Sequence, residues 1–233
     1  MDYTPYEEFA KDKLEIKFND INLLVTALTH RSYVNEHRKT HEHNERLEFL
    51  GDAVLELVSS DFLYRNYNEP EGIMTAVRAA LVRTESIGDA GKELGYAPLV
   101  RMSKGEMMGS ERAHDSILAD CFEAVIGAIY LDQGYEAARE FIAKHILVKI
   151  NTILEEESWR DPKSYVQELA QKIDGETPVY KTIKEDGPDH DKTFTVGIYV
   201  GETLKGTGTG HSKQEAQTEA AKEGVKNYRK DIK

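Results

Sequence analysis

Apolar residues recur at three- and four-residue spacing through the first two thirds of the chain. This spacing predicts helices over residues 21–29, 45–64, 73–94, 117–132 and 135–154. No clean alternation of apolar and polar residues, which would predict strands, interrupts these segments. Residues 1–157 are therefore expected to form an all-helical domain.

The pattern changes after residue 158. Residues 164–173 again have helical spacing, and a last helix is predicted over residues 212–228 with Ser212 as its N-cap. Between these helices, three segments alternate and are rich in β-branched and aromatic residues: 179–185, 194–200 and 203–207. The short connections predict an antiparallel sheet, in the order helix, three strands, helix.

The two regions are joined by a polar stretch that runs from Glu155 to Pro162, which is typical of a linker. We expect a first domain over 1–157, a linker over 158–161 and a second domain over 162–233. Residues 158–233 carry 13 Lys or Arg and 13 Asp or Glu, so the net charge of −12 falls entirely on the first domain. Such a chain does not attract nucleic acid through bulk positive charge.

Acidic residues are clustered on one predicted helix. Glu45, Glu48 and Asp52 lie within roughly 60° of one another around the helix axis. The opposite, core-facing stripe is predicted to be Leu47, Leu50, Val54 and Leu57. Like charges at this spacing repel each other, so the pattern indicates either a solvated acidic face or a site for a cation.

A second acidic pair, Asp120 and Glu123, is spaced three apart in a strongly apolar helix. Acids that border so apolar a segment are rarely buried without a partner. Gly127, near the same face, would let another helix approach closely. Two packed helices that each contribute carboxylates would form an oxygen site for Mg²⁺ or Mn²⁺. The alternative is an ion-paired cluster whose cation is Arg46, Arg78 or Arg83.

Three motifs in this region resemble those of ribonuclease III. They are NERLEFLGDAVL at residues 44–55, SILADCFEA at 116–124 and ALTHRSY at 27–33. The second domain, with DPKSYVQEL at 161–169 and GTGTGHSK at 206–213, resembles a double-stranded RNA-binding domain. The resemblance covers nearly the whole chain, in the short bacterial-type arrangement. It implies an all-helical endonuclease domain followed by an α-β-β-β-α domain with both helices on one side of the sheet.

The resemblance also implies an activity. The chain would hydrolyse double-stranded RNA without a covalent intermediate, leaving 5′-phosphate and 3′-hydroxyl ends with short 3′ overhangs. Divalent ions, Mg²⁺ with Mn²⁺ as a substitute, would be held by Glu48, Asp52, Asp120 and Glu123. Asp52 and Glu123 match the pair usually singled out as catalytic, while Glu45 and Glu71 match supporting positions. Expected substrates are precursors of ribosomal RNA, with messenger and transfer RNA precursors as further candidates.

The resemblance also implies which residues contact a second subunit and which contact RNA. Phe49 matches an aromatic that packs into a second subunit, which implies a homodimer with one cleavage site per subunit. The matching RNA-binding residues are Gln167, Glu168, His190, Ser212 and Lys213. Gln214 departs from the family, which usually has a basic residue here, and the domain is neutral overall. Fewer phosphate contacts predict weaker RNA binding by the isolated domain.

The remaining features bear on location and cysteine chemistry. The N-terminal ten residues carry acids and no apolar core, and the apolar run 124–131 is far shorter than the ~20 residues of a membrane helix. A single cysteine, Cys121, excludes an internal disulfide and is expected in the core rather than as a nucleophile. A cytoplasmic protein that binds neither membranes nor DNA is expected.

Overall fold

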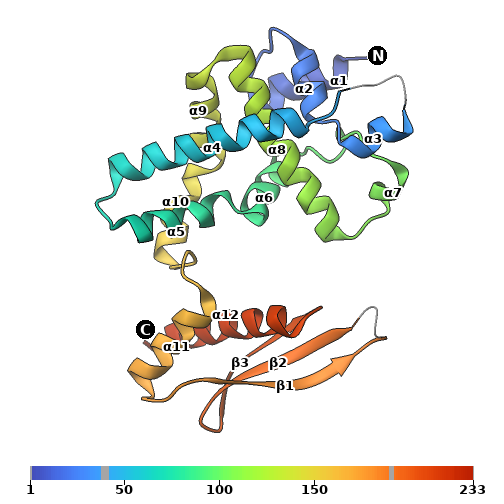
Figure 1. Cartoon of the computed structure of the whole chain (residues 1–233). Helices are drawn as coiled ribbons and strands as arrows, with labels where there is room; N and C mark the ends of the chain where they lie inside the picture. The colour runs from blue at the N-terminus through green and yellow to red at the C-terminus, as the bar shows by residue number, and fades with distance from the viewer. Residues whose placement is uncertain (1, 38–41, 189–191, 233) are drawn as a thin grey trace. The chain divides into compact units, whose positions relative to one another are not determined.

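The computed structural model describes residues 2–37, 42–188 and 192–232. The chain folds into two compact units, residues 1–159 and residues 160–233 (Figure 1). Neither unit contains, in its described residues, a helix long and apolar enough to cross a membrane.

The first unit is built of helices, as the spacing of its apolar residues predicts. Its elements, in chain order, are α1 (Thr4–Phe9), η1 (Ala10–Leu14), α2 (Ile21–Ala27), α3 (Arg31–Glu36), α4 (Glu45–Asn66), α5 (Glu71–Val82), α6 (Thr84–Leu94), α7 (Lys104–Met107), α8 (Glu111–Gln133), α9 (Tyr135–His145), η2 (Leu147–Lys149) and α10 (Ile150–Glu155).

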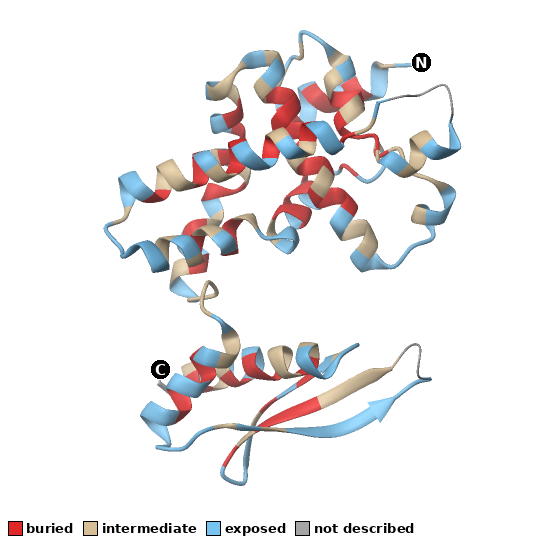
Figure 2. Cartoon of the chain, in the orientation of Figure 1, coloured by how far each residue is buried: buried red, intermediate tan, exposed pale blue. Residues whose placement is uncertain are grey.

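Helix α8 lies at the centre of this unit. Its residues from Ile117 to Ile129 are buried, in a run that only Asp120 and Glu123 interrupt. Figure 2 shows the buried positions concentrated on α8 and on the helix faces turned toward it. A helix surrounded by others must be apolar on most of its circumference. The two partly buried acids therefore lie at the edge of the core.

Helices α4 and α8 cross in close contact because each has a glycine at the crossing. A Cβ atom on Gly51 would lie 1.7 Å from the carbonyl oxygen of Glu123, and one on Gly127 would lie 2.2 Å from that of Leu47. Both distances are far below van der Waals contact, so no other residue fits without moving a helix. The close approach that the sequence predicts at Gly127 is thus confirmed.

The structure divides two of the predicted helices. The helix predicted over 73–94 is two helices, α5 and α6, because Arg83 between them is extended, with ψ of 150°. The turn directs α6 onto α8, where a Cβ on Gly88 would lie 2.9 Å from the carbonyl oxygen of Asp115. The segment predicted as a helix over 135–154 likewise divides into α9, η2 and α10.

The second unit has the predicted order of elements: α11 (Pro162–Ile173), β1 (Val179–Asp186), β2 (Thr193–Val200), β3 (Thr203–Gly210) and α12 (Lys213–Ile232). The strands form an antiparallel sheet in the order β1-β2-β3. Its core contains side chains of both helices and of β2, among them Val166, Ile198 and Ala220. Both helices therefore pack on the same face of the sheet.

Strand β3 touches α12 through glycines. A Cβ on Gly208 would lie 2.2 Å from the backbone nitrogen of Ala220, and one on Gly206 would lie 2.6 Å from that of Gly224. This contact brings the start of α12 close to the end of β3. The Oγ atom of Ser212 accepts a hydrogen bond from the Glu215 backbone N–H at 3.1 Å, which confirms the predicted N-cap.

Candidate functional site

Two helices each place a pair of carboxylates beside the glycine crossing. Glu48 and Asp52 flank Gly51 on α4, while Asp120 and Glu123 interrupt the buried run of α8. Because Gly51 lies against the backbone of Glu123, the two acidic pairs are brought to the same side of the crossing. We call Glu48, Asp52, Asp120 and Glu123 the carboxylate site.

The carboxylates of this site are partly buried and repel one another. Burial, with added repulsion from Asp120, Glu45 and Asp52, raises the pKa of Glu48 to about 7. Burial and repulsion from the other three members raise the pKa of Glu123 to about 8. The pKa of Asp120 is also raised, mainly by burial. Burial is the main cause of all three shifts, and repulsion among the acids adds to it.

The predicted alternative, an ion-paired cluster, does not describe this site. None of its four carboxylates forms an ion pair with a Lys or Arg among the residues that the structure describes. Arg78, one of the three candidate cations, lies 2.8 Å from Glu56 instead. The acids are therefore neither fully solvated nor paired.

The donor chemistry of the site fits a divalent cation that prefers oxygen. Four carboxylates without counter-charge are the ligands that Mg²⁺ and Mn²⁺ take in proteins. No three His, Cys, Asp or Glu side chains in the described part of the chain already converge on one point as a ready-made metal cluster. The side chains must therefore adjust when an ion binds, while the helix backbones already hold them on one side.

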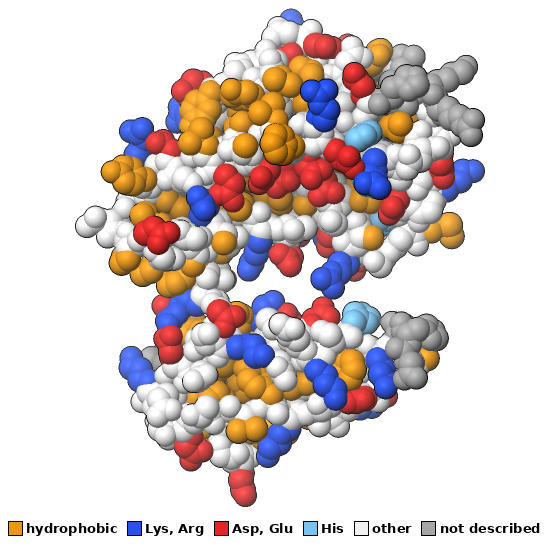
Figure 3. Space-filling view, viewed as in Figure 1, with side chains coloured by type: hydrophobic (Ala, Val, Ile, Leu, Met, Phe, Trp, Pro, Cys, Tyr) orange, Lys and Arg blue, Asp and Glu red, His pale blue; other side chains and the backbone are white. Residues whose placement is uncertain are grey.

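Acidic side chains form a continuous band across the first unit, bordered by apolar side chains (Figure 3). A cavity of about 620 Å³ opens at this band, and its lining includes Glu48 and Asp120 of the carboxylate site. The other lining residues are His30, Arg31, Asn44, Glu45 and Glu106. The site is thus open to a large ligand.

Glu45 lies at the rim of this cavity, where its carboxylate pairs with Arg31 at 3.1 Å. His30, which sequence reasoning did not single out, lies close enough to Asp120 to oppose the rise in its pKa. His30 lies within the ALTHRSY motif, and that position was the available signal.

Asn44 is a second residue that the sequence reasoning missed. It is buried; its side-chain amide donates to Cys121 Sγ at 3.6 Å and its backbone N–H donates to the Thr29 carbonyl at 2.9 Å. The first contact ties the start of α4 to α8 next to Asp120, and the second ties it to the segment that follows α2. Cys121 is buried, as expected, and burial raises the pKa of its thiol.

Glu71 lies apart from the carboxylate site within one chain. It begins α5, and its carboxylate accepts a hydrogen bond from Thr75 at 3.0 Å. Arg78, seven residues later, contacts Glu56 on α4, so Glu71 lies about 10 Å further along α5. The structure therefore does not bring Glu71 next to the four carboxylates, and its role stays a prediction.

Phe49 belongs to an exposed apolar stripe on α4. Its side chain is 81% exposed, and Leu57 and Tyr64 on the same helix are 57% and 78% exposed. Leu57 was predicted to face the core, and the structure shows that prediction to be wrong. Helical spacing places all three residues within about 80° of one another around α4. The helix thus has a second apolar face that the unit does not cover.

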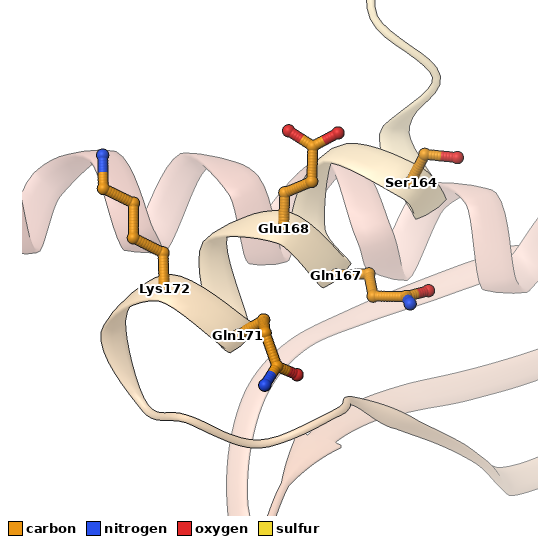
Figure 4. A pocket seen from close by; sticks show the side chains of 5 residues that line it. All are labelled: Ser164, Gln167, Glu168, Gln171 and Lys172. Atoms are coloured by element: carbon orange, nitrogen blue, oxygen red, sulfur yellow. The ribbon is translucent and has the colours of Figure 1, made fainter.

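The second unit presents a row of polar side chains along α11. Ser164, Gln167, Glu168, Gln171 and Lys172 line a shallow cavity of about 520 Å³, and Figure 4 shows them projecting from this helix. Two predicted RNA-binding residues, Gln167 and Glu168, are among them. Glu168 forms an ion pair with Arg160. Asp161 Oδ1 caps the helix by accepting from the Ser164 backbone N–H at 2.8 Å.

The start of α12 holds two more predicted residues. Ser212 caps the helix, and Lys213 Nζ lies 2.8 Å from a carboxylate oxygen of Glu185 on β1. Gln214, in place of the usual basic residue, is exposed in the first turn. The predicted RNA-binding residue His190 lies outside the described residues.

These features place the chain in a class of two-domain proteins: a helical domain with an open carboxylate site suited to a divalent ion, followed by an α-β-β-β-α domain with an exposed polar helix face. Family comparisons make the class specific. Residues 20–150 match the "Ribonuclease-III-like" family model, and residues 162–228 match the model of the double-stranded RNA binding motif. The chain belongs to the ribonuclease III family, whose members depend on divalent metal ions.

Individual relatives agree with this assignment. The chain is 46% identical to "Ribonuclease 3" of Pelotomaculum thermopropionicum, over 92% of this chain and 90% of that protein. It is 45% identical to "Ribonuclease 3" of Oceanobacillus iheyensis, over 95% and 96%. The solved nuclease domain of ribonuclease III from Campylobacter jejuni is 39% identical. It superposes with a TM-score of 0.53 and covers 59% of this chain and 96% of that domain.

Proposed function

We propose that this chain hydrolyses phosphodiester bonds in double-stranded RNA, and that the carboxylate site is where the bond is cut. The observation that carries the proposal is the set of four unpaired carboxylates at the crossing of α4 and α8. A double-stranded RNA binding motif on the same chain supplies the substrate class. The products would be 5′-phosphate and 3′-hydroxyl ends.

Mg²⁺, with Mn²⁺ as a substitute, is the proposed ion of the site. When bound, such an ion lowers the pKa of water and stabilises negative charge on a phosphate. Glu48, Asp52, Asp120 and Glu123 would hold it, with Asp52 and Glu123 as the catalytic pair. Glu45, held by Arg31, would support the rim that receives RNA.

RNA would be held by the second unit. Gln167 and Glu168, on the exposed face of α11, can hydrogen-bond the 2′-hydroxyls of an RNA minor groove. Ser212 and Lys213 place backbone N–H groups and a cation at the start of α12, where phosphates bind well. His190 would enter a second minor groove, following the resemblance.

The active form would be a homodimer that pairs through the exposed stripe of Phe49, Leu57 and Tyr64. Contiguous exposed apolar side chains mark interaction surfaces. The related Campylobacter nuclease domain has a region involved in dimer formation. Each subunit would cut one strand, and the staggered cuts would leave short 3′ overhangs. Precursors of ribosomal RNA, and of messenger and transfer RNA, are the proposed substrates, in the cytoplasm.

The deciding experiment is cleavage of a long, perfectly paired RNA duplex with and without Mg²⁺. The matching single strand and a DNA duplex of the same sequence serve as controls. Cutting of the RNA duplex alone, and only with Mg²⁺, is expected. Binding of the duplex without cutting would instead make the chain an RNA-binding protein whose helical domain serves only to dimerise.

A further inference from the structure

Arg78 on α5 holds a fifth carboxylate, Glu56, along the edge of the carboxylate site. Its Nε lies 2.8 Å from Oε2 of Glu56, and a terminal guanidinium nitrogen donates to Ser60 Oγ at 2.8 Å. Ser60 in turn donates to the Glu56 backbone carbonyl at 2.6 Å. A guanidinium with two directed contacts fixes a carboxylate in one orientation, which a lysine does less well.

Glu56 is close to the site and has the chemistry of its ligands. It stands one helical turn beyond Asp52 on α4, about 5 to 6 Å along the same face. Its charge is also among those that raise the pKa of Glu123. Glu56 thus differs from the members of the site chiefly in having a cation of its own.

We propose that Arg78 is a positioning residue that keeps Glu56 out of the metal site, so that the divalent ion is bound by the four carboxylates alone. This inference rests on the proposed function. Without Arg78, an additional free carboxylate would face the ion. Without Glu56, the guanidinium would lose its carboxylate partner, and its positive charge would repel the ion. The pair therefore sets the net charge that the ion meets.

The two partners should consequently have opposite effects on metal binding. Arg78→Ala leaves the Glu56 carboxylate unpaired and should tighten binding of a divalent ion. Glu56→Gln leaves the guanidinium unpaired and should weaken it. The double variant removes both charges and should restore the original affinity. If the Arg78–Glu56 pair only held α5 against α4, both single variants would change the affinity for the ion in the same direction. The double variant would then not recover the original affinity.

Calorimetric titration of the full chain with Mn²⁺, without RNA, tests this directly. One unit of charge near a divalent ion is expected to change the dissociation constant about tenfold. We therefore expect about tenfold tighter binding for Arg78→Ala and about tenfold weaker binding for Glu56→Gln, with the double variant within about twofold of the original. Cleavage should fall in Arg78→Ala, whose ion is misplaced, and recover in the double variant.

Arg65→Ala is the matched control, because it removes the same charge from an ion pair on α4, with Asp61 at 2.7 Å, that lies further from the site. Its Mn²⁺ affinity should stay within about twofold. Single variants that shift affinity in the same direction would overturn the inference, and so would a double variant no better than the worse single one. If Arg78→Ala does not fold, unchanged affinity in Glu56→Gln overturns it alone.

Failure of the proposed function would look different. In that case the unaltered chain would not bind Mn²⁺, or Glu123→Gln would bind it as well as the unaltered chain does. Loss of Mn²⁺ binding in Glu123→Gln, with the Arg78 and Glu56 variants unchanged, would leave the proposed function standing and remove only the role of Arg78.

Discussion

The carboxylate site of the first unit and two carboxylates of the second unit, Asp174 and Glu185, have opposite surroundings. In the carboxylate site, burial and mutual repulsion raise the pKa of Glu48, Asp120 and Glu123. In the second unit, a hydrogen bond from Tyr228 lowers the pKa of Asp174, and one from Lys213 lowers that of Glu185. The second unit supplies a donor for these two carboxylates, whereas the described residues of the first unit supply no Lys or Arg partner for its site.

The difference separates structural acids from acids that need a ligand. Asp174 accepts from the Tyr228 hydroxyl and pairs with Lys205 at 3.1 Å, so its charge contributes to the fold. The carboxylate site gains nothing comparable from its own chain and is destabilising when ionised. A cation bound from solution would offset this destabilisation. The unpaired acids therefore indicate a binding site for a cation.

The contrast between the two units should change most when one charge is removed from the carboxylate site. Glu123→Gln keeps the shape of the side chain and should reduce cleavage of an RNA duplex by about 10³-fold or more, because ion and water lose a ligand. Duplex binding, measured by gel shift without metal, should stay within about twofold because the second unit is unaltered. Cleavage at a comparable rate would show that the metal ligands are assigned wrongly.

A second test separates α4 and α8, the two helices that hold the acids of the carboxylate site close together. Gly51→Ala places a Cβ atom 1.7 Å from the Glu123 carbonyl oxygen and should destabilise the first unit by about 3 kcal/mol, with loss of cleavage. Gly72→Ala on α5 is the control, since its Cβ meets nothing within 4 Å; it should change stability by less than about 1 kcal/mol. Urea unfolding curves measure both. Equal stability of the two variants would contradict the close crossing.

A third test uses pH and Mg²⁺ together. Because the folded site has raised pKa values, about 7 for Glu48 and about 8 for Glu123, the fold binds more protons than the unfolded chain above pH ~4.5. This stabilisation is complete below pH ~4.5 and is lost as the pH rises toward 8. Mg²⁺ should therefore raise the melting temperature by about 3–8 °C at pH 8.5 and by little at pH 5.5.

Tryptophan fluorescence reports this transition, because the chain's one tryptophan, Trp159, packs against the core of the first unit. A chain with both Glu48→Gln and Glu123→Gln should melt at a temperature that depends little on Mg²⁺ at either pH. An equal Mg²⁺ effect at both pH values in the unaltered chain would rule out the carboxylate site as its source.

The smallest expected effect lies in the second unit. Glu185 pairs with Lys213, the proposed phosphate contact, and so competes with RNA for it. Glu185→Gln should tighten duplex binding by about two- to fivefold at low salt. Asp186→Asn is the matched control, since its carboxylate pairs with Lys184 instead. If both variants tighten binding equally, the effect is one of net charge and not of Lys213.

Helical spacing predicted the longer helical segments of the first unit, but it missed the short helices α1, α3 and α7 and did not show where the longer segments turn. The break at Arg83 has no glycine or proline to mark it, and it exists because α5 packs on α4 while α6 packs on α8. Such a break depends on tertiary contacts that spacing does not record. In the second unit, Gly and Pro residues lie between the strands and mark where they end. The predicted order of elements was confirmed there.

The candidate site was predictable because its acids are spaced three and four apart on two helices within recognisable motifs. The sequence could not distinguish a metal site from an ion-paired cluster, since Arg46, Arg78 or Arg83 was available as the cation. The fold sends Arg78 to Glu56. The prediction that Leu57 faces the core was wrong for a similar reason. Apolar spacing identifies an apolar helix face, but it does not show whether the core of the same unit covers that face.

The glycine crossing has a consequence for how activity depends on temperature. Since α4 and α8 touch backbone to backbone at Gly51 and Gly127, their separation is set by atoms that every residue shares. Close-packed interiors yield little, so a contact between two backbones can widen only if the helices themselves move apart. The cleavage rate should therefore follow a straight Arrhenius line up to the unfolding transition and then fall abruptly, without a range of gradual decline.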